Sequence, residues 1–349
     1  YTSPGPSEIL IRNSAVAINP LDWAKVLMGD MMFGWLKYPI VLGSDVAGEV
    51  IEVGKNVNAA QFQVGDRVVG NAVGMDKRSN KSAEGGFQKY TVLRTNLACR
   101  IPEHVSYERA AVIPLGFSTA ACGLFMKDQL ALQFPSVPSR PTGQTLVIWG
   151  GSTSVGCNAI QIAKAAGYEV ITTSSPKNFE YVKKLGASYV FDYRSPSTVK
   201  EIIGVLKNKT CAGALAIGFG STEACLAIVA ASKGKKFVAQ ASAPLDLWNF
   251  PSGVFALVGT MLGTVWSVLA LAIRARVHGV GVKFIFGTDL MANEVGSTVW
   301  NDFLPKALAN GEFVPAPEPH VVGKGLEHLQ EAMDLSKKGV SAKKVVVTL

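Results

Sequence analysis

The sequence has few cysteines, and no pattern among them could build a cross-linked or metal-bound scaffold. The five are odd in number, and no two stand in a C-x-x-C pair: Cys99, Cys122, Cys157, Cys211 and Cys225. A disulfide framework or a zinc knuckle needs closely spaced or even-numbered cysteines. Their absence excludes both classes and predicts a reducing compartment, so we expect a cytoplasmic protein.

Charge is also scarce and scattered. Only 17% of the 349 residues are charged, although the formal net charge is +8, and no basic run is interleaved with aromatic residues. This pattern excludes nucleic-acid binding as the main function. With 48% hydrophobic residues the chain can bury sizeable cores, which excludes a largely disordered protein. The positive balance favours a phosphorylated cofactor or an acidic partner.

One long stretch, residues 247–273, contains no charged residue at all. Within it, Val254–Ile273 is long enough to cross a bilayer. Three glycines and three hydroxyl residues dilute its apolar character, and a membrane span would split the domain predicted around it. We therefore expect a buried helix and strand that carry a dimer contact or an apolar substrate wall. Contact with a membrane surface is the alternative.

The segment Leu146–Gly156, LVIWGGSTSVG, is the strongest local pattern. An apolar strand runs into a glycine turn, a helix follows to Gly167, and a second strand begins at Tyr168. This order is typical of a dinucleotide-binding unit, in which backbone N–H groups at the helix start approach a pyrophosphate. The predicted cofactor-binding residues of the turn are Gly151, Ser152, Thr153, Ser154, Val155 and Gly156.

The end of the second strand lacks a carboxylate. NAD enzymes place Asp or Glu there to bind the ribose hydroxyls, but this segment reads TTSSPKNF, with no acid between Glu169 and Glu180. Hydroxyl, amide and ammonium groups could instead bind a 2′-phosphate, which favours NADPH. The residues predicted for this role are Ser174, Ser175, Lys177 and Asn178. Ser175 before Pro176 also fits a plain helix N-cap.

The pattern of expected strands and helices changes along the chain. Before residue 100, short strands punctuated by Gly, Asn and Asp indicate a small β-barrel. From Glu169 to Gln240, strands alternate with helices, which predicts a parallel, doubly wound sheet. Beyond Phe284 we expect a strand, a helix around 297–308, an amphipathic helix at 324–337 and a closing strand at Lys344–Leu349.

Several motifs in order resemble the medium-chain dehydrogenase/reductase superfamily. They are AINPLD from Ala17, VLGSDVAGEVIEVG from Val41, VGDRVVG from Val64, GGFQKYTV from Gly85, AAVIPLGFSTA from Ala110, the glycine turn, LGASYVFDY from Leu185 and KGVSAKKVVV near the C-terminus. The resemblance implies an α/β fold: a GroES-like β-barrel catalytic domain (1–118 and 285–349) and a doubly wound Rossmann NADP-binding domain (119–284). It also implies a hydride-transfer site in the cleft.

The zinc-containing members of that superfamily carry Cys and His ligands in these motifs. This chain has Asn19, Ser44-Asp45 and Leu115 at the matching positions, and no cysteine between Asn71 and Gly85. A catalytic zinc needs three converging N, S or O ligands, which Asp22 and Asp45 alone do not supply. We therefore predict no metal site.

The zinc-free motifs resemble the quinone oxidoreductase and enoyl reductase branch, and most closely the fungal trans-acting enoyl reductases of polyketide biosynthesis. The resemblance implies hydride transfer to an activated alkene, Tyr193 as a further cofactor contact, and a carrier-bound acyl or apolar small-molecule substrate with a polyketide synthase as a partner. It also implies apolar pocket walls, for which we predict Ala120, Gly123, Leu124, Phe255 and Met261.

The proton donor is left open by the sequence. The catalytic candidates are Lys25, Asp22 and Asn19, in or just after the Asn-Pro-x-Asp motif, and solvent is the alternative. Lys25 also fits a solvated helix residue, and Asp22 a helix cap. The rival functions are NADPH-dependent quinone or alkenal reduction, a non-catalytic NADPH-binding protein and a membrane-associated protein. Both a monomer and a homodimer fit the sequence.

Overall fold

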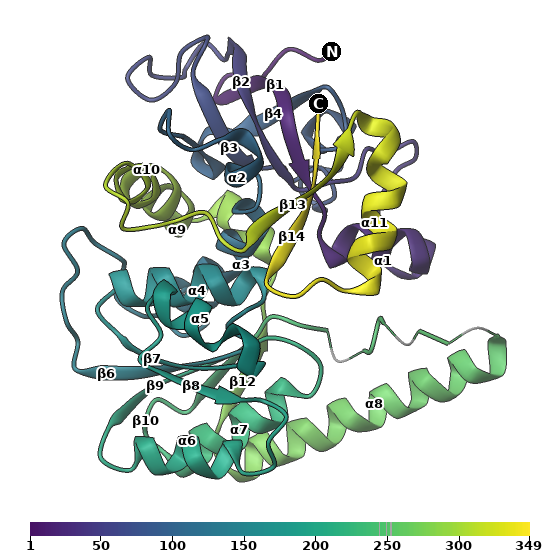
Figure 1. Ribbon diagram of the computed structural model, residues 1–349. Helices are drawn as coiled ribbons and strands as arrows, with labels where there is room; N and C mark the ends of the chain where they lie inside the picture. Colours follow the sequence, from purple (N-terminus) through teal and green to yellow (C-terminus); the bar gives the residue numbers. More distant parts are fainter. Residues whose placement is uncertain (244, 249, 252) are drawn as a thin grey trace. The chain divides into compact units, whose positions relative to one another are not determined.

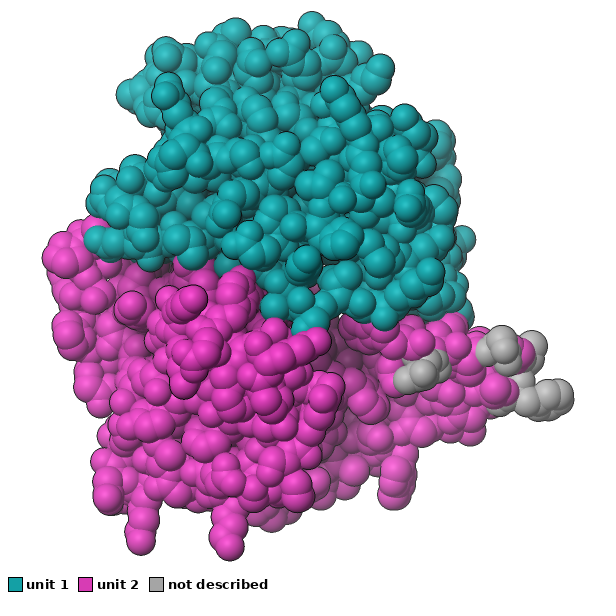
Figure 2. All heavy atoms as spheres, viewed as in Figure 1, with its two compact units in different colours: residues 1–118, 287–349 teal, residues 119–286 magenta. Residues whose placement is uncertain are grey.

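The computed structural model describes the whole chain except residues 244, 249 and 252, and the side chains of 254 and 255 also lie outside the described part. The chain divides into two compact units (Figure 2). Unit 1 comprises Tyr1–Ser118 and Gly287–Leu349, and unit 2 comprises Thr119–Phe286.

Unit 1 is built on a seven-stranded sheet in the order β13-β14-β1-β2-β3-β5, with β4 paired to β1. Its neighbours are antiparallel except β13 and β14, which are parallel. The closing strand therefore lies beside the first one (Figure 1). The strands are β1 (Glu8–Ala17), β2 (Asp45–Val53), β3 (Arg67–Asn71), β4 (Tyr90–Arg94), β5 (Ala98–Arg100), β13 (Glu318–Lys324) and β14 (Lys343–Thr348).

The helices of unit 1 are short. The first, α1, begins at Pro20, where proline cannot continue a strand but suits a first helical turn. The full set is α1 (Pro20–Met28), α2 (Tyr107–Ala110), α3 (Pro114–Phe125, which continues into unit 2), α9 (Glu294–Ser297), α10 (Leu304–Ala309) and α11 (Leu329–Lys338). The predicted amphipathic helix thus begins later than expected, because residues up to Lys324 belong to β13.

Unit 2 contains a parallel sheet in the order β12-β11-β9-β6-β7-β8, with the short β10 paired to β9. The strands are β6 (Gln144–Trp149), β7 (Glu169–Ser174), β8 (Tyr189–Asp192), β9 (Thr210–Ala216), β10 (Lys233–Gly234), β11 (Phe237–Gln240) and β12 (Gly281–Phe284). The helices are α4 (Ser154–Ala165), α5 (Phe179–Leu185), α6 (Thr198–Leu206), α7 (Ser221–Ala231) and α8 (Val254–Val277).

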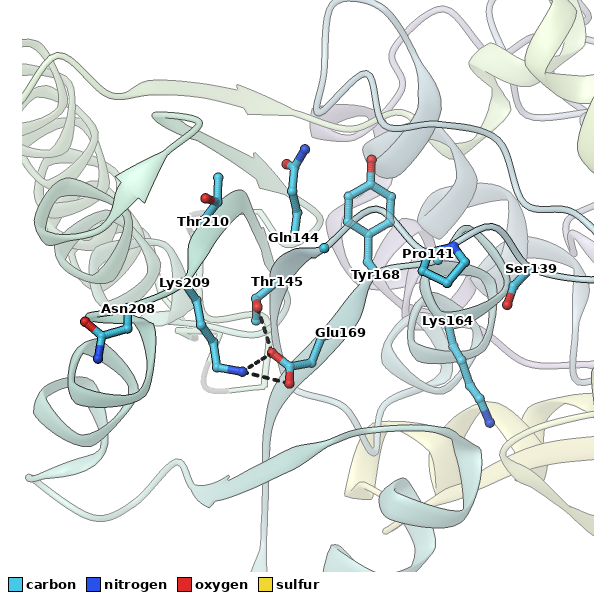
Figure 3. A pocket seen from close by; sticks show the side chains of 12 residues that line it. Ser139, Pro141, Gln144, Thr145, Lys164, Tyr168, Glu169, Asn208, Lys209 and Thr210 are labelled. Atoms are coloured by element: carbon cyan, nitrogen blue, oxygen red, sulfur yellow. Dashed lines mark hydrogen bonds and ion pairs between the residues drawn. The ribbon is translucent and has the colours of Figure 1, made fainter.

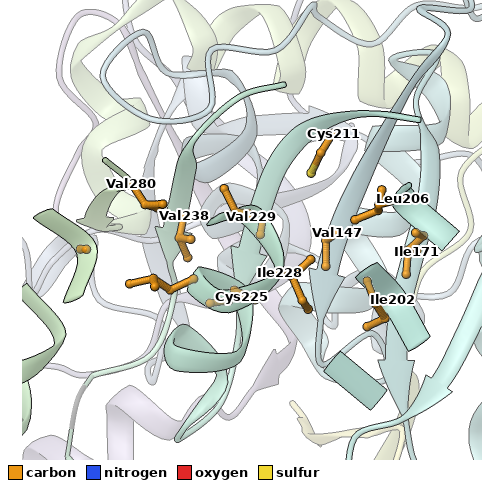
Figure 4. Packing of buried hydrophobic residues seen from close by; sticks show 14 residues of the cluster. Val147, Ile171, Ile202, Leu206, Cys211, Cys225, Ile228, Val229, Val238 and Val280 are labelled. Carbon is orange, nitrogen blue, oxygen red and sulfur yellow. The ribbon is translucent and has the colours of Figure 1, made fainter. Parts of the chain in front are cut away.

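The core of unit 2 lies between this sheet and the helices α6 and α7 (Figure 4). Val147, Ile171 and Val238 of the strands are fully buried against Ile202 of α6 and Ile228 of α7. Fully burying such a side chain stabilises the fold by about 1.5–3 kcal/mol. The strands carry apolar residues on both faces, as expected for a parallel sheet that is covered on both sides.

The uncharged stretch folds differently from the prediction. It forms one long helix, α8, and most of its apolar side chains are exposed rather than buried: Trp266 is 72% and Leu262 66% exposed. Among its described side chains, Leu271 and Ala275 in the C-terminal part pack on this core. An 18-residue window within Ala256–Val277 has a mean hydropathy of 2.0, so by length and composition this helix could cross a membrane. The expectation of a buried helix and strand is wrong.

Candidate functional site

The glycine turn connects β6 to α4 in unit 2. Gly150 has a φ of +90°, a left-handed conformation that favours glycine, and its N–H donates to Thr173 Oγ1 at 3.0 Å. A side chain at Gly156 would approach the carbonyl oxygen of Gly150 to 2.2 Å, so the helix can start this close to the turn only with glycine. These contacts hold the N-terminus of α4 at the carboxyl end of β6.

Thr153 caps that helix. Its hydroxyl accepts from the Gly156 N–H at 3.0 Å and donates to the Gly150 carbonyl at 2.8 Å. Ser154, the first residue of α4, has a buried Oγ without a hydrogen-bond partner among the described residues. Ser152 and Val155 are partly exposed, and Gly151 is buried. Free N–H groups and a hydroxyl at a helix N-terminus form a suitable anion site, so this turn fits a pyrophosphate.

The predicted 2′-phosphate residues follow the next strand. Ser174 ends β7 and is buried, and its Oγ has no partner among the residues described. Ser175 occupies the N-cap position before Pro176 without a capping side-chain hydrogen bond, and Lys177 is exposed. Asn178 is partly exposed at the end of the same turn. Donor groups thus gather after β7, and no carboxylate stands among Ser174–Asn178 themselves.

One acid that the linear sequence did not bring into view lies on the neighbouring strand. Asp192 ends β8 and is the register partner of Ser174. The next residue, Tyr193, is 43% exposed, and the Arg194 guanidinium lies 5.2 Å from the centre of its ring. The residues suited to a dinucleotide therefore all lie at the carboxyl edge of the unit 2 sheet, where such ligands bind in open parallel sheets.

A second cluster of polar groups is buried in unit 1, where β1 ends and α1 begins. Asp22 is fully buried, and its Oδ2 accepts from the Asn19 N–H at 2.7 Å, as in a capping box. The predicted cap is therefore present. Burial raises the pKa of Asp22 to about 7, and the nearby Asp45 carboxylate adds to this rise in pKa. Asp22 Oδ1 and Asn19 Nδ2 have no hydrogen-bond partner among the described residues.

Lys344 of β14 completes the cluster. Its Nζ lies 2.8 Å from Asp45 Oδ2 and donates to Asn19 Oδ1. The other Asp45 oxygen accepts from the Leu115 N–H at 2.6 Å. Asn71, opposite Asp45 in the β2–β3 register, is also buried, and neither polar atom of its side chain has a partner among the described residues.

These residues do not fit a zinc ion. At three positions that match the zinc ligands described above, this chain has the amide Asn19, the alcohol Ser44 and the apolar Leu115. The Asp45 carboxylate is paired with the Lys344 ammonium. The described residues contain no group of three or more His, Cys, Asp or Glu side chains that could hold a metal ion. The polar side chains of this cluster are therefore suited to hydrogen bonding and proton transfer and not to holding zinc.

Lys25 occupies a different environment from the one predicted. Its side chain is buried, and its Nζ donates to the carbonyl oxygens of Gly29 and Met32, both at 2.7 Å. The Asp30 Oδ1 lies 3.6 Å from the same Nζ. Two hydrogen bonds and an ion pair thus hold the ammonium just beyond the end of α1. This arrangement stabilises the helix end and gives no support to Lys25 as a proton donor or as a solvated side chain.

The predicted pocket residues do not gather around an open space. Ala120 and Leu124 of α3 are wholly buried, and a Cβ on Gly123 would lie 2.6 Å from Ile285 Cδ1. Met261 is 38% exposed on α8, and the side chain of Phe255 lies outside the described residues. The three α3 residues belong to packed interior, so they give no support to a pocket wall there.

One hollow in unit 2, of about 520 Å³, is shown in Figure 3. It is lined by residues at the amino ends of the strands, among them Thr145 and Glu169, and Lys209 Nζ lies 2.6 Å from Glu169 Oε2. Ligands of open α/β sheets bind at the opposite, carboxyl edge. We therefore assign this hollow to an ion-paired surface and not to the cofactor site.

Sequence reasoning missed Lys344 and Asn71. A signal for Lys344 existed: it precedes the apolar run Val345–Val347 in a strand, and its neighbour Lys343 points to solvent. Alternation within a strand places successive side chains on opposite faces, so one of two adjacent lysines must face inward. For Asn71 the sequence carries no comparable signal.

Comparisons with known proteins cover both units. The family described as "Alcohol dehydrogenase GroES-like domain" matches residues 5–103, and the family described as "Zinc-binding dehydrogenase" matches residues 154–236. The chain is similar to "Dehydrogenase pigH" of Monascus ruber, with 54% identity over 350 residues, covering 100% of this chain and 94% of that protein.

It is also similar to "Lovastatin nonaketide synthase, enoyl reductase component lovC" of Aspergillus terreus, with 33% identity, covering 98% of this chain and 89% of that protein. Among solved structures, an alcohol dehydrogenase superfamily protein from Novosphingobium aromaticivorans matches with a TM-score of 0.72 and 25% identity, covering 100% of this chain and 93% of that one. These matches confirm the predicted fold class, a GroES-like barrel plus a doubly wound Rossmann sheet.

Proposed function

Since this chain belongs to the medium-chain dehydrogenase/reductase superfamily, we propose that it is an NADPH-dependent, zinc-independent reductase of a C=C bond conjugated to a carbonyl or thioester. The observation that carries this proposal is the unit 1 cluster, in which Asp45 is paired with Lys344 and Asn19 is an amide. These groups cannot hold a Lewis acid to polarise an alcohol. Besides the hydride that a reduced nicotinamide would supply, alkene reduction needs only orientation, hydrogen-bond donors and a proton.

The cofactor assignment rests on unit 2. The turn residues Gly151–Gly156 would hold the pyrophosphate, and Ser174, Ser175 and Lys177 the 2′-phosphate, with Asn178 and Tyr193 beside them. Lys177 supplies charge, and the buried Ser174 Oγ lacks a partner among the described residues. When bound, a reduced nicotinamide would supply a hydride to the β-carbon of the alkene.

The residues of unit 1 would serve the other half of the reaction. Asn19 Nδ2 is a buried donor without a partner in the described chain, suited to a carbonyl oxygen that gains negative charge. After hydride addition the α-carbon must take up one proton. Asp22, with its pKa near 7, is about half protonated at neutral pH and is our candidate for the group that supplies the proton, directly or through water. Lys25 is omitted because the end of α1 engages it.

The similarity to a synthase-associated enoyl reductase favours an acyl substrate bound to a carrier, with a polyketide synthase as partner. Quinone or alkenal reduction would use the same residues and is the rival within the class. A non-catalytic NADPH-binding protein would need only the unit 2 residues. We place the protein in the cytoplasm, as a monomer or homodimer.

The exposed apolar helix α8 favours one further candidate, a membrane-associated protein. The chain path argues against a full crossing. Helix α8 is about 36 Å long at 1.5 Å per residue, and both of its ends return to one sheet because β11 and β12 are paired. Residues 241–253 would then have to recross the hydrocarbon, and this segment is shorter than the roughly 20 residues that a membrane-spanning helix needs.

The test is a turnover assay with NADPH deuterated at the transferred position. We expect NADPH oxidation with an α,β-unsaturated thioester and one deuterium at the β-carbon of a saturated product. Quinone reduction with a semiquinone signal and no saturated thioester would favour the rival. Tight NADPH binding without turnover of enoyl thioesters, enones or quinones would refute a reductase. Recovery of the protein only with detergent or lipid would favour the membrane candidate.

A further inference from the structure

Lys344 and Asn19 face each other across the end of a strand pair. Strands β1 and β14 are antiparallel, with Ala17 opposite Val346. Two residues beyond the end of β1, Asn19 is still extended, and continuing the register sets it opposite Lys344. The Ile18 N–H donates to the Val345 carbonyl at 2.9 Å between them. The contact is therefore fixed by the sheet, although 325 residues separate the two side chains.

The ammonium determines which way the Asn19 amide is turned. Lys344 has only donors, so Asn19 must present its oxygen to Lys344 Nζ, as observed. The Nδ2 group then faces away, buried and without a partner among the described residues. A buried donor left unpaired costs about 1–3 kcal/mol, so the amide would relax into another orientation if Lys344 did not hold it.

We propose that Lys344 is a positioning residue that locks the Asn19 carboxamide with Nδ2 directed at the acceptor, which, if the proposed function holds, is the carbonyl oxygen of the substrate. Asp45 holds Lys344 in turn, through the 2.8 Å ion pair, and the Leu115 N–H fixes Asp45. The contacts thus run from α3 through Asp45 of β2 and Lys344 of β14 to the Asn19 carboxamide.

The same lysine acts on Asp22. Its positive charge lowers the pKa of that carboxyl, whereas burial and the Asp45 charge raise the pKa. Lys25, on the same helix, is engaged at the helix end. Helix α11 packs on α1, but its charged side chains are all exposed: Glu331, Asp334, Lys337 and Lys338. Lys344 and Asp45 are therefore the charged partners of Asp22 in this cluster.

The experiment compares Lys344→Met with Lys343→Met, a matched control at the exposed neighbour on the same strand. For Lys344→Met we expect kcat to fall about 10²-fold, as on losing an oriented oxyanion donor, with the Kd for NADPH unchanged. The pH at which kcat is half-maximal should rise for Lys344→Met and fall for Asp45→Asn. Lys344→Arg should recover most of kcat. Asp45→Asn/Lys344→Met, which removes both charges, should fold and return that pH close to the wild-type value.

A readout without turnover separates this proposal from the proposed function. The side-chain amide signals of Asn19 and the carboxyl titration of Asp22 are followed by NMR in the full chain. A changed Asn19 amide environment and an upward-shifted Asp22 titration in Lys344→Met support the positioning role even if no alkene is reduced. Unchanged Asn19 signals and an unchanged Asp22 titration, with folded protein, would overturn it.

Discussion

Asp22→Asn should reverse a pH dependence of stability that the buried carboxyl creates. The pKa of Asp22 is raised from 3.8 to about 7, chiefly by burial. Since the folded state holds the proton more tightly than the unfolded chain, stability is greatest below pH 4 for this group and falls as the pH rises toward 7. Each pH unit corresponds to about 1.4 kcal/mol, so three units amount to about 4 kcal/mol.

The asparagine carries no charge at any pH, and its oxygen can still accept from the Asn19 N–H. We therefore expect the free energy of unfolding of Asp22→Asn, relative to the wild type, to rise by about 4 kcal/mol between about pH 4 and pH 8. Urea unfolding followed by circular dichroism at several pH values measures this difference. The control is Asp302→Asn, at an exposed carboxyl of the same unit, for which the difference should be flat.

Parallel pH curves for Asp22→Asn and the wild type would refute the reasoning. They would mean that the carboxyl ionises in the folded state as readily as in the unfolded chain. In that case Asp22 would act only as a helix cap, and the proton of the proposed reaction would have to come from elsewhere.

Three other changes test separate parts of the structure. Lys177→Ala removes one charge-assisted contact, so it should raise the Kd for NADPH about tenfold and leave the Kd for NADH unchanged. A fluorescence titration measures both constants, and equal effects on the two cofactors would contradict the 2′-phosphate role. Gly156→Ala should lower the melting temperature and NADPH affinity because its Cβ meets the Gly150 carbonyl, whereas Gly204→Ala, with open space around it, should be neutral or slightly stabilising. Replacing Leu262 and Val265 by lysine should leave the melting temperature unchanged, because both are 66% exposed, and reduce self-association in light scattering; a large loss of stability would show that α8 is packed in solution.

The parts of the fold that the sequence predicted are those determined by neighbouring residues. The glycine turn, the helix that follows it and the strand end at Ser174 each depend on a few adjacent side chains and on backbone geometry. Local rules of capping and turn formation therefore suffice to place them. The zinc misfit at Asn19 and Leu115 could likewise be inferred from residue types alone.

The parts that the sequence did not predict depend on contacts between distant segments. Lys25 looks like a surface lysine until the carbonyls of the following turn fold back onto it. The apolar composition of α8 suggests burial, but composition does not determine whether another element covers a helix. Lys344 reaches Asn19 only because β14 pairs with β1, and no local pattern specifies that register.

The charges of the unit 1 cluster help to explain why the pKa of Asp22 is raised to about 7. Lys344 and Asp45 neutralise each other at 2.8 Å, and both are buried. An ionised Asp22 would leave a net negative charge in the same interior, which desolvation makes costly. Protonation of Asp22 removes that charge, in line with its raised pKa. Since the proposed reduction consumes one proton in each turnover, we expect the buried Asp22, beside an ion pair that makes the cluster unsuitable for a metal, to be its acid.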